Sequence, residues 1–315
     1  MTLLITGASG FLGVSLVRHL RALGNDVVAL SSTDADLKDP GSLTKYSHYK
    51  YDRIYHLAAW TQAGDFCLSH AGEQWLINQQ INTSVLRWWA EEQPQAKLIS
   101  IGTSCAYQEG RDLKEEYYLT GEPIADLYTY ALTKRMLYVG QQSLARQFGL
   151  KYLTVVPSTL YGPNYHVGTK QMHFIFDLAW KFLSNKHYGD EVVLWGDGYQ
   201  RRELVFVDDF VADLLCLDEK VDNDIVNIGA GQDFSIREFA RILCELLGTD
   251  PDRVRYDITR YVGAKEKYLN TEKEAALLGR LDRTPLALGL EKTLAWLEPR
   301  FIELTSHRKT KKEGA

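Results

Sequence analysis

The chain has 315 residues, and 45% of them are hydrophobic, so it can bury a large core in one large domain or two lobes. Its net charge of -5 disfavours nucleic acid as a partner, because phosphate backbones bind basic surfaces. No apolar stretch approaches the ~20 residues of a membrane-spanning helix, and the N-terminus lacks a signal-peptide pattern. We therefore expect a cytoplasmic protein that binds neither nucleic acid nor membranes.

A glycine-rich turn follows the first predicted strand, residues 3–6, and precedes a helical pattern over residues 14–23. In this setting Gly7 permits a tight turn, Gly10 lets the backbone approach a pyrophosphate, and Gly13 allows close packing of helix on strand. The order of strand, turn and helix is typical of dinucleotide binding. The neighbouring residues expected to line the same site are Ser9, Phe11 and Leu12.

Four more apolar runs, residues 26–30, 53–57, 97–101 and 152–157, alternate with periodic segments of helix length. This alternation predicts an α/β fold with a doubly wound parallel sheet, the Rossmann architecture. Functional groups then collect at the carboxyl ends of the strands. The candidates at these ends are Leu57, Ala58 and Ala59 after the third strand, Thr103, Ser104 and Cys105 after the fourth, and Pro157 at the end of the fifth.

Tyr130 and Lys134 stand four residues apart, so on a helix both side chains can reach one pocket. A nearby ammonium favours the phenolate and brings the pKa of a phenol toward the working range. The pair therefore suits proton transfer coupled to hydride transfer. The alternative is a structural pair, because this spacing often occurs by chance.

The second half is less regular. Turn-forming residues occur at 161–164 and 195–198, apolar residues at 204–207 and 226–228 could form strands, and residues 236–247 predict a helix capped by Ser235. We expect a dinucleotide-binding domain over 1–160, with 203–228 returning to it. The remaining segments, 161–202 and 229–305, would form a smaller mixed α/β substrate-binding lobe, followed by a polar tail over 306–315.

The four cysteines are Cys67, Cys105, Cys216 and Cys244. Their wide spacing, without a CxxC pair or a histidine at ligand spacing, predicts free thiols and no metal site.

Thr103, Tyr130, Lys134 and the glycine turn resemble the extended short-chain dehydrogenase/reductases, over nearly the whole chain. Within this superfamily the chain resembles the GDP-L-fucose synthases, which are 3,5-epimerase/4-reductases. Their Ser-Ser-Cys-x-Tyr motif corresponds to residues 103–107. Their Gly-Pro turn motif, followed after ten residues by a histidine, corresponds to residues 157–163 and His173.

This resemblance implies roles for individual residues. Cys105 and His173 would be the opposed acid and base of epimerisation, although a small core thiol and a structural histidine are the alternative. The synthase Trp-Gly-x-Gly-x-x-x-Arg-Glu pattern corresponds to residues 195–203. The implied substrate contacts are Ser104, Lys181, Arg202 and Lys267, with Trp195 either on the substrate or in the core.

The second strand ends at Ser31, where NAD enzymes usually have a carboxylate that binds the ribose and rejects a 2′-phosphate. NADP(H) is favoured on this ground. NAD(H) stays open because no arginine follows Ser31 or lies in the glycine turn. The resemblance adds Asp36, Leu37 and Asn78 to the cofactor contacts, together with Tyr130 and Lys134 at the nicotinamide ribose.

Together these features predict an NAD(P)H-dependent GDP-sugar 4-reductase, alone or combined with 3,5-epimerisation, that acts on a 4-keto-6-deoxy hexose or a heptose. One alternative is an epimerase or dehydratase that retains its cofactor. Ser104 and Cys105 argue against the usual dehydratase route, because dehydratases of this superfamily commonly have Asp-Glu there. The other alternative is a non-catalytic dinucleotide-binding regulator.

The apolar faces of 75–89 and 128–144 would either form a homodimer interface, as in the family, or pack on the sheet.

Overall fold

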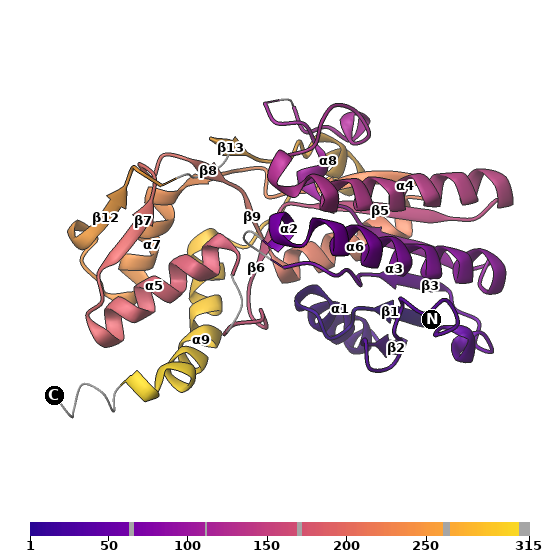
Figure 1. The fold of residues 1–315 in the computed structure, drawn as a ribbon, viewed down its shortest axis with the longest axis horizontal. Helices are drawn as coiled ribbons and strands as arrows, with labels where there is room; N and C mark the ends of the chain where they lie inside the picture. Colours follow the sequence, from indigo (N-terminus) through magenta and orange to yellow (C-terminus); the bar gives the residue numbers. More distant parts are fainter. Residues whose placement is uncertain (63–65, 111, 169–171, 261–264, 309–315) are drawn as a thin grey trace.

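The computed structural model describes residues 1–62, 66–110, 112–168, 172–260 and 265–308. The chain forms two lobes, with the large sheet in one and helices α5, α7 and α9 in the other (Figure 1). Within the described ranges, none of the helices combines the length and apolarity needed to cross a membrane.

A six-stranded parallel sheet forms the centre of the larger lobe, in the order β10-β5-β4-β3-β1-β2. The doubly wound fold is thereby confirmed. Because β1 pairs with both β2 and β3, the chain order reverses there, and a ligand crevice is expected at the carboxyl ends of β1 and β3. The strands are β1 (Thr2–Thr6), β2 (Asp26–Leu30), β3 (Arg53–His56), β4 (Lys97–Ile101), β5 (Tyr152–Pro157) and β10 (Asp224–Ile228).

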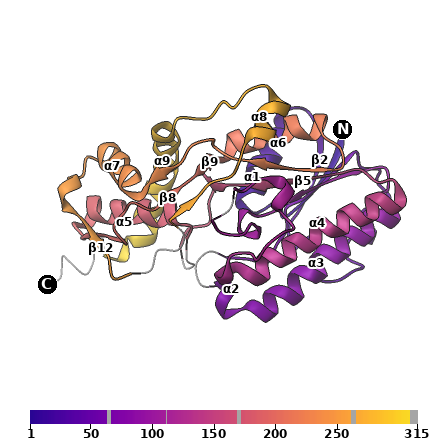
Figure 2. The ribbon, with the colours of Figure 1, turned by 90° about the horizontal axis from the view of Figure 1, so that it is seen from above.

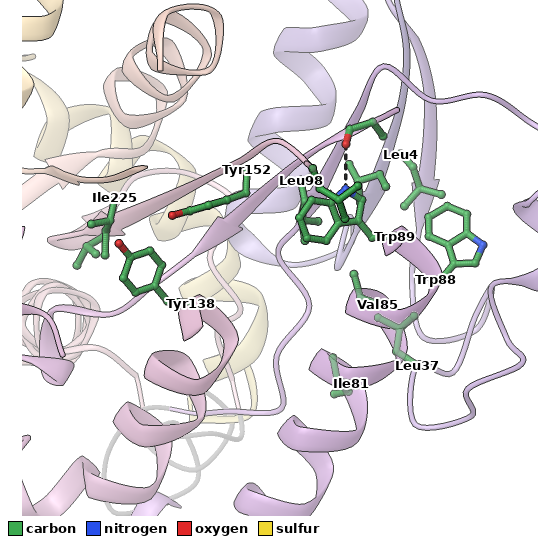
Figure 3. Packing of buried hydrophobic residues seen from close by; sticks show 14 of the residues in the cluster. Leu4, Leu37, Ile81, Val85, Trp88, Trp89, Leu98, Tyr138, Tyr152 and Ile225 are labelled. Carbon is green, nitrogen blue, oxygen red and sulfur yellow. Dashed lines mark hydrogen bonds between the residues drawn. The ribbon is translucent and has the colours of Figure 1, made fainter. Parts of the chain in front are cut away.

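Helices cover both faces of this sheet. On one face lie α3 (Ala71–Glu92) and α4 (Tyr128–Phe148), and on the other α1 (Phe11–Ala22) and α6 (Val207–Lys220) (Figure 2). Successive side chains of a strand point to opposite faces of the sheet. Leu4 therefore packs with Val85, Trp88 and Trp89 in a cluster that we call the α3 cluster, whereas Leu3 packs with Leu16 and Leu214 on the other face. Figure 3 shows the α3 cluster, where the Trp89 indole N–H donates to the carbonyl of Ala96 at 2.9 Å.

Several predicted boundaries were wrong by one to three residues, and three of them illustrate the reason. Helix α1 begins at Phe11 and not at Val14, β3 ends at His56 and not at Leu57, and Val207 opens α6 instead of ending a strand. In each case the apolar pattern reflects what packs against the segment. The packing environment and the backbone conformation need not change at the same residue, so the pattern does not mark the exact boundary.

The smaller lobe has its own core, formed by α5 (Phe174–Tyr188), α7 (Ile236–Leu247) and α9 (Leu286–Thr305) beside the parallel pair β7 (Val192–Trp195) and β12 (Val254–Asp257). The predicted α7 is confirmed. Ser235 caps it in a capping box, accepting from the Glu238 amide while the Glu238 carboxylate accepts from Ser235.

Short strands occupy the region between the lobes (Figure 1). β6 (Thr159–Tyr161) pairs with β9 (Leu204–Phe206), and β8 (Arg201–Arg202) lies between β11 (Phe234–Ser235) and β13 (Glu266–Lys267). Two short helices complete the fold, α2 (Phe66–Ser69) and α8 (Glu272–Leu278). Of the predicted polar tail, residues 309–315 lie outside the described residues.

Candidate active site

The glycine turn packs against the end of β3 so closely that side chains are excluded. Gly7 has φ +69°, and a Cβ there would lie 2.7 Å from the Ala58 amide nitrogen. A Cβ on Gly13 would lie 2.3 Å from the carbonyl oxygen of Gly7. The turn leads straight into α1, whose first amide groups have no helical acceptor, and this cradle fits the pyrophosphate of a dinucleotide.

Other predicted residues of this turn lie in different surroundings. Ser9 is exposed, and Leu12 packs partly in the core beneath α1. The Phe11 ring contacts the Tyr165 ring edge-on, with centroids 5.4 Å apart, and so touches the smaller lobe. Leu57, Ala58 and Ala59 are half-buried beside Gly7, and Pro157 is half-buried at the end of β5.

An exposed carboxylate lies against Ser31, which follows β2 at the predicted adenosine end of the site. Asp34 folds back so that its carboxylate accepts from the Ser31 amide at 2.9 Å and from the Ser31 hydroxyl at 2.5 Å. These bonds, with a smaller effect of Lys45, lower the pKa of Asp34. Sequence reasoning missed this contact, which brings the carboxylate of Asp34 back to Ser31 from three residues further on. The turn-forming Ser-x-x-Asp pattern was the available signal.

Asp36, Leu37 and Asn78 are already engaged by the protein. Asp36 is exposed and pairs with Lys38 at 3.2 Å, while the Leu37 side chain is buried in the α3 cluster. The Asn78 amide oxygen accepts from the Trp60 amide at 2.9 Å, and its nitrogen donates to the Trp60 carbonyl at 3.0 Å. Asn78 thus fixes the loop that follows β3.

A buried chain of hydrogen bonds that sequence reasoning missed lies below the crevice. Thr6 Oγ1 is 2.8 Å from His56 Nδ1, and His56 Nε2 is 3.3 Å from the amide oxygen of Asn82. Asn82 donates to the carbonyl of Thr133 on α4. Burial, together with the positive charge of Lys134, lowers the pKa of His56 to about 3, so the imidazole is neutral and structural.

Tyr130 and Lys134 share one face of α4, and the Lys134 ammonium lies 6.0 Å from the centre of the Tyr130 ring. Burial lowers the pKa of Lys134 to about 8. Burial, followed by Cys105 and Tyr118, raises the pKa of Tyr130 above its ordinary value. The expectation of a lowered phenol pKa was thus wrong here, because desolvation is the largest influence on the pKa of Tyr130. The outcome is a neutral phenol that can donate a proton.

Thr103 lies at the end of β4, where its hydroxyl oxygen accepts from the Cys105 amide at 3.3 Å. Its own amide donates to the Tyr118 hydroxyl at 3.3 Å. Arg135, next to Lys134 on α4, donates to the carbonyls of Ala106 and Thr120. This arginine therefore couples the helix of Tyr130 to the segment that carries Thr103.

Cys105 and His173 both lie near Lys267. The Lys267 ammonium donates to Cys105 Sγ at 3.0 Å. His173 is the N-cap residue of α5, and the residue as a whole is exposed. Its imidazole is nevertheless desolvated. This desolvation, together with the positive charge of Lys267, lowers the pKa of His173. Lys267 and Ser104 also line a cavity of about 320 Å³.

The proposed phosphate side carries cations from several elements. Trp195 is 53% exposed, which excludes the core alternative for this residue. Lys181, which also pairs with Asp177, lies 5.7 Å from the Trp195 ring centre, and Arg260 lies 5.4 Å from it. Arg260 was missed by sequence reasoning, because no motif marks it. Arg202 on β8 lies opposite Lys267 on β13 in the pairing of these two strands.

Among the described residues, no cluster of His, Cys, Asp and Glu is suited to hold a metal ion.

A parallel sheet with a glycine cradle at its reversal point, and a threonine, a tyrosine and a lysine beside it, defines a dinucleotide-dependent enzyme. The sequence pattern of the NAD dependent epimerase/dehydratase family matches residues 3–229, and the chain belongs to that family.

Relatives and solved structures of the same kind cover almost the whole chain. It is 28% identical over 302 residues to the GDP-L-colitose synthase of Yersinia pseudotuberculosis, covering 93% of this chain and 96% of that protein. It is also 28% identical to a dTDP-4-dehydro-6-deoxy-D-allose reductase from Streptomyces, covering 94% and 95%. The NADP-bound crystal structure of a GDP-L-fucose synthetase from Naegleria fowleri superposes with a TM-score of 0.84 at 21% identity, covering 95% and 94%.

Proposed function

We propose that the protein is an NADP(H)-dependent 4-reductase of a GDP-linked 4-keto sugar and that Cys105 and His173 add epimerisation at the neighbouring carbons. The observation that carries the reductase is the placement of Tyr130 and Lys134 on one face of α4, with the Lys134 nitrogen 6.0 Å from the Tyr130 ring centre, next to the Thr103 segment. The names of the relatives support a nucleotide-linked keto sugar as substrate.

The residues of the site divide the work of reduction. A bound nicotinamide would supply the hydride for the ketone carbon. Tyr130 would donate its phenolic proton to the developing alkoxide, and the Thr103 hydroxyl would polarise the same carbonyl. Lys134 would donate to the cofactor ribose and place a positive charge beside Tyr130 as the phenolate forms.

Epimerisation requires proton exchange beside the ketone from opposite faces. Cys105 and His173 both lie near Lys267 and can transfer protons, and they come from different lobes. Each would remove or return a proton while the negative charge of the enolate rests on the ketone oxygen, near Thr103 and Tyr130.

The two lobes would bind the two ligands. Residues 1–160 and 203–228 would hold the dinucleotide, with the pyrophosphate on the Gly7 turn. Residues 161–202 and 229–305 would hold the nucleotide sugar, with its diphosphate near Lys181 and Arg202 and its base or ribose on Trp195. We further propose a cytoplasmic homodimer that does not bind nucleic acid.

NADPH consumption with freshly generated 4-keto sugars linked to GDP or dTDP would test the reductase, with the products analysed by NMR. We expect stoichiometric oxidation of NADPH with the GDP-linked ketone. Conversion of the sugar without net oxidation would indicate an epimerase or dehydratase with retained cofactor. Cofactor binding without any conversion across the panel would indicate a regulator.

The epimerase is tested separately in deuterated water without NADPH. The wild type should place deuterium at the carbons beside the ketone, and Cys105→Ser should suppress this exchange because a hydroxyl is a far weaker acid-base group than a thiol. Reduction of an already epimerised ketone should be almost unchanged in that variant. If mass spectrometry finds only non-enzymatic exchange in the wild type, the protein is a reductase alone.

A further inference from the structure

Lys267 contacts a thiol, and its assignment as a substrate-binding residue does not account for this contact. Its ammonium lies 3.0 Å from Cys105 Sγ, although 162 positions separate the two residues in the chain. An ammonium that donates to sulfur stabilises the negative charge that develops there when the thiol reacts. The same positive charge acts on His173.

The position of Lys267 is fixed by buried structure. β13 pairs with β8, so that Lys267 lies opposite Arg202. Glu203, the residue that follows β8, is only 1% exposed, and its carboxylate accepts from the Leu269 amide at 2.9 Å and from the Ala230 amide at 2.6 Å. Glu203 therefore anchors the strand that presents Lys267 to Cys105.

Three other ionisable groups interact with Cys105, namely Cys67 on α2, Tyr118 in the segment after β4 and Tyr130 on α4. Burial, and to a smaller extent the interaction with Cys105, raises the pKa of each of the three. None of the three brings a positive charge to the thiol. Lys267 is thus the cation that the described structure places in hydrogen-bonding contact with Cys105.

We propose that Lys267 is a positioning residue that polarises the Cys105 thiol for proton transfer. The catalytic consequence rests on the epimerase proposed above. When Cys105 removes a proton, the carbon–hydrogen bond beside the ketone breaks, its electron pair moves to the ketone oxygen as the enolate forms, and the proton goes to the sulfur. Lys267 stabilises the sulfur before that transfer, and the return of the proton reverses the step.

Alkylation by iodoacetamide at neutral pH, followed by mass spectrometry, measures this polarisation directly. Cys216 is exposed on α6 and serves as an internal reference, because it lies outside the site. Lys267→Met should slow alkylation of Cys105 relative to Cys216 by about tenfold. Lys267→Arg keeps the charge and should restore most of the rate, which a merely structural role would not predict. Lys265→Met, at an exposed lysine two residues away, is the matched control and should change nothing.

An unchanged Cys105 rate in Lys267→Met, or an equal effect of Lys265→Met, would overturn the inference. Lys267→Gln replaces the methionine variant if the latter does not fold. The deuterium experiment separates failure of the inference about Lys267 from failure of the proposed epimerase. Dependence of alkylation on Lys267 without wild-type exchange would leave the polarised thiol in place and remove only the epimerase. Exchange that persists in Lys267→Met with unchanged alkylation would keep the epimerase and remove the role of Lys267.

Discussion

Burial moves the pKa values of Tyr130 and Lys134 in opposite directions. It raises the pKa of the phenol and lowers that of the ammonium to about 8, so both residues favour their uncharged forms more than they would in water. A neutral tyrosine is the protonation state that reduction needs, because the alkoxide must receive a proton. The lysine, by contrast, has to keep its proton to bind the ribose.

Tyr130→Phe should lower turnover by at least ~100-fold, the usual contribution of a positioned acid, and leave cofactor affinity almost unchanged. Steady-state NADPH oxidation and a fluorescence titration of cofactor binding measure the two effects. Tyr128→Phe, on the exposed side of the same helix, is the control and should behave as the wild type. Near-normal turnover of Tyr130→Phe would remove this residue from the mechanism.

Cofactor affinity should decrease as the pH rises through about 8. Below this value Lys134 is an ammonium, and above it the folded protein increasingly holds a neutral amine that attracts the ribose oxygens less strongly. NADPH titrations across the slightly acidic to alkaline range measure the change. Lys134→Gln should bind more weakly and lose the pH dependence. An affinity that stays constant across this range in the wild type would contradict the assigned role.

Asp34 brings a negative charge to the edge where the adenosine ribose is expected. Asp34→Ala should therefore increase the preference for NADPH over NADH several-fold, measured as the ratio of the two kcat/KM values, because a carboxylate repels a 2′-phosphate. Asp36→Ala, at an exposed carboxylate paired with Lys38, should leave this ratio unchanged. An unaltered ratio in Asp34→Ala would place the 2′-position elsewhere.

At the scale of elements, a buried charge cluster joins β3 and β4 to the end of α6, away from the crevice. Asp218 is buried and accepts from Arg53 at 3.0 Å and from the Tyr55 hydroxyl at 2.8 Å, and it pairs with the buried Lys97 at 3.1 Å. Removing one partner of such a cluster leaves a buried charge uncompensated.

Asp218→Asn should therefore decrease the free energy of unfolding by about 3–5 kcal/mol, measured by chemical denaturation. The neighbouring Glu219 is exposed and lies 3.6 Å from Arg53, so Glu219→Gln should cost less than about 1 kcal/mol. Equal effects of the two substitutions would show that the cluster does not stabilise the sheet.

At the scale of the molecule, the helices α3 and α4 lie side by side along one side of the sheet (Figure 2). Their inner residues pack on the sheet, as one sequence alternative holds. Leu76 is nevertheless 63% exposed and Met136 47% exposed. Within one helix, some apolar residues thus pack on the sheet while others are left on the surface, where they could contact a second copy of the chain. Exposed apolar side chains of this kind are typical of interfaces.

If α3 and α4 form the dimer interface, the combined change Leu76→Glu and Met136→Glu should convert a dimer into a monomer, because it places charges in an apolar contact. Light scattering coupled to size-exclusion chromatography measures the mass. Leu288→Glu, at an exposed position of α9, is the control and should leave the dimer intact. A wild-type monomer, or a dimer that survives the double change, would refute the proposed interface.

Local signals were sufficient for the sheet, the glycine turn and the capped helix α7. The apolar runs of β1, β3, β4 and β5 reflect burial on both faces. The turn needs glycine at position 7 because the residues that follow β3 lie against it, and the Ser235 cap depends on Glu238 only three residues away. Such features depend on neighbours in the chain or on an environment common to all buried strands, so the sequence alone determines them.

Only the tertiary structure decided the chemistry of individual site residues. The contact of Lys267 with Cys105 joins segments 162 positions apart, and no periodicity encodes it. The raised pKa of Tyr130 arises from desolvation by the packed chain, whereas spacing showed only a lysine four residues away. Trp195 is exposed and Leu37 is buried for the same reason, since solvent exposure is a property of the assembled surface. Spacing along the chain specifies which residues can contact one another. The packing of the folded chain decides which of these contacts form and how far each side chain is shielded from solvent.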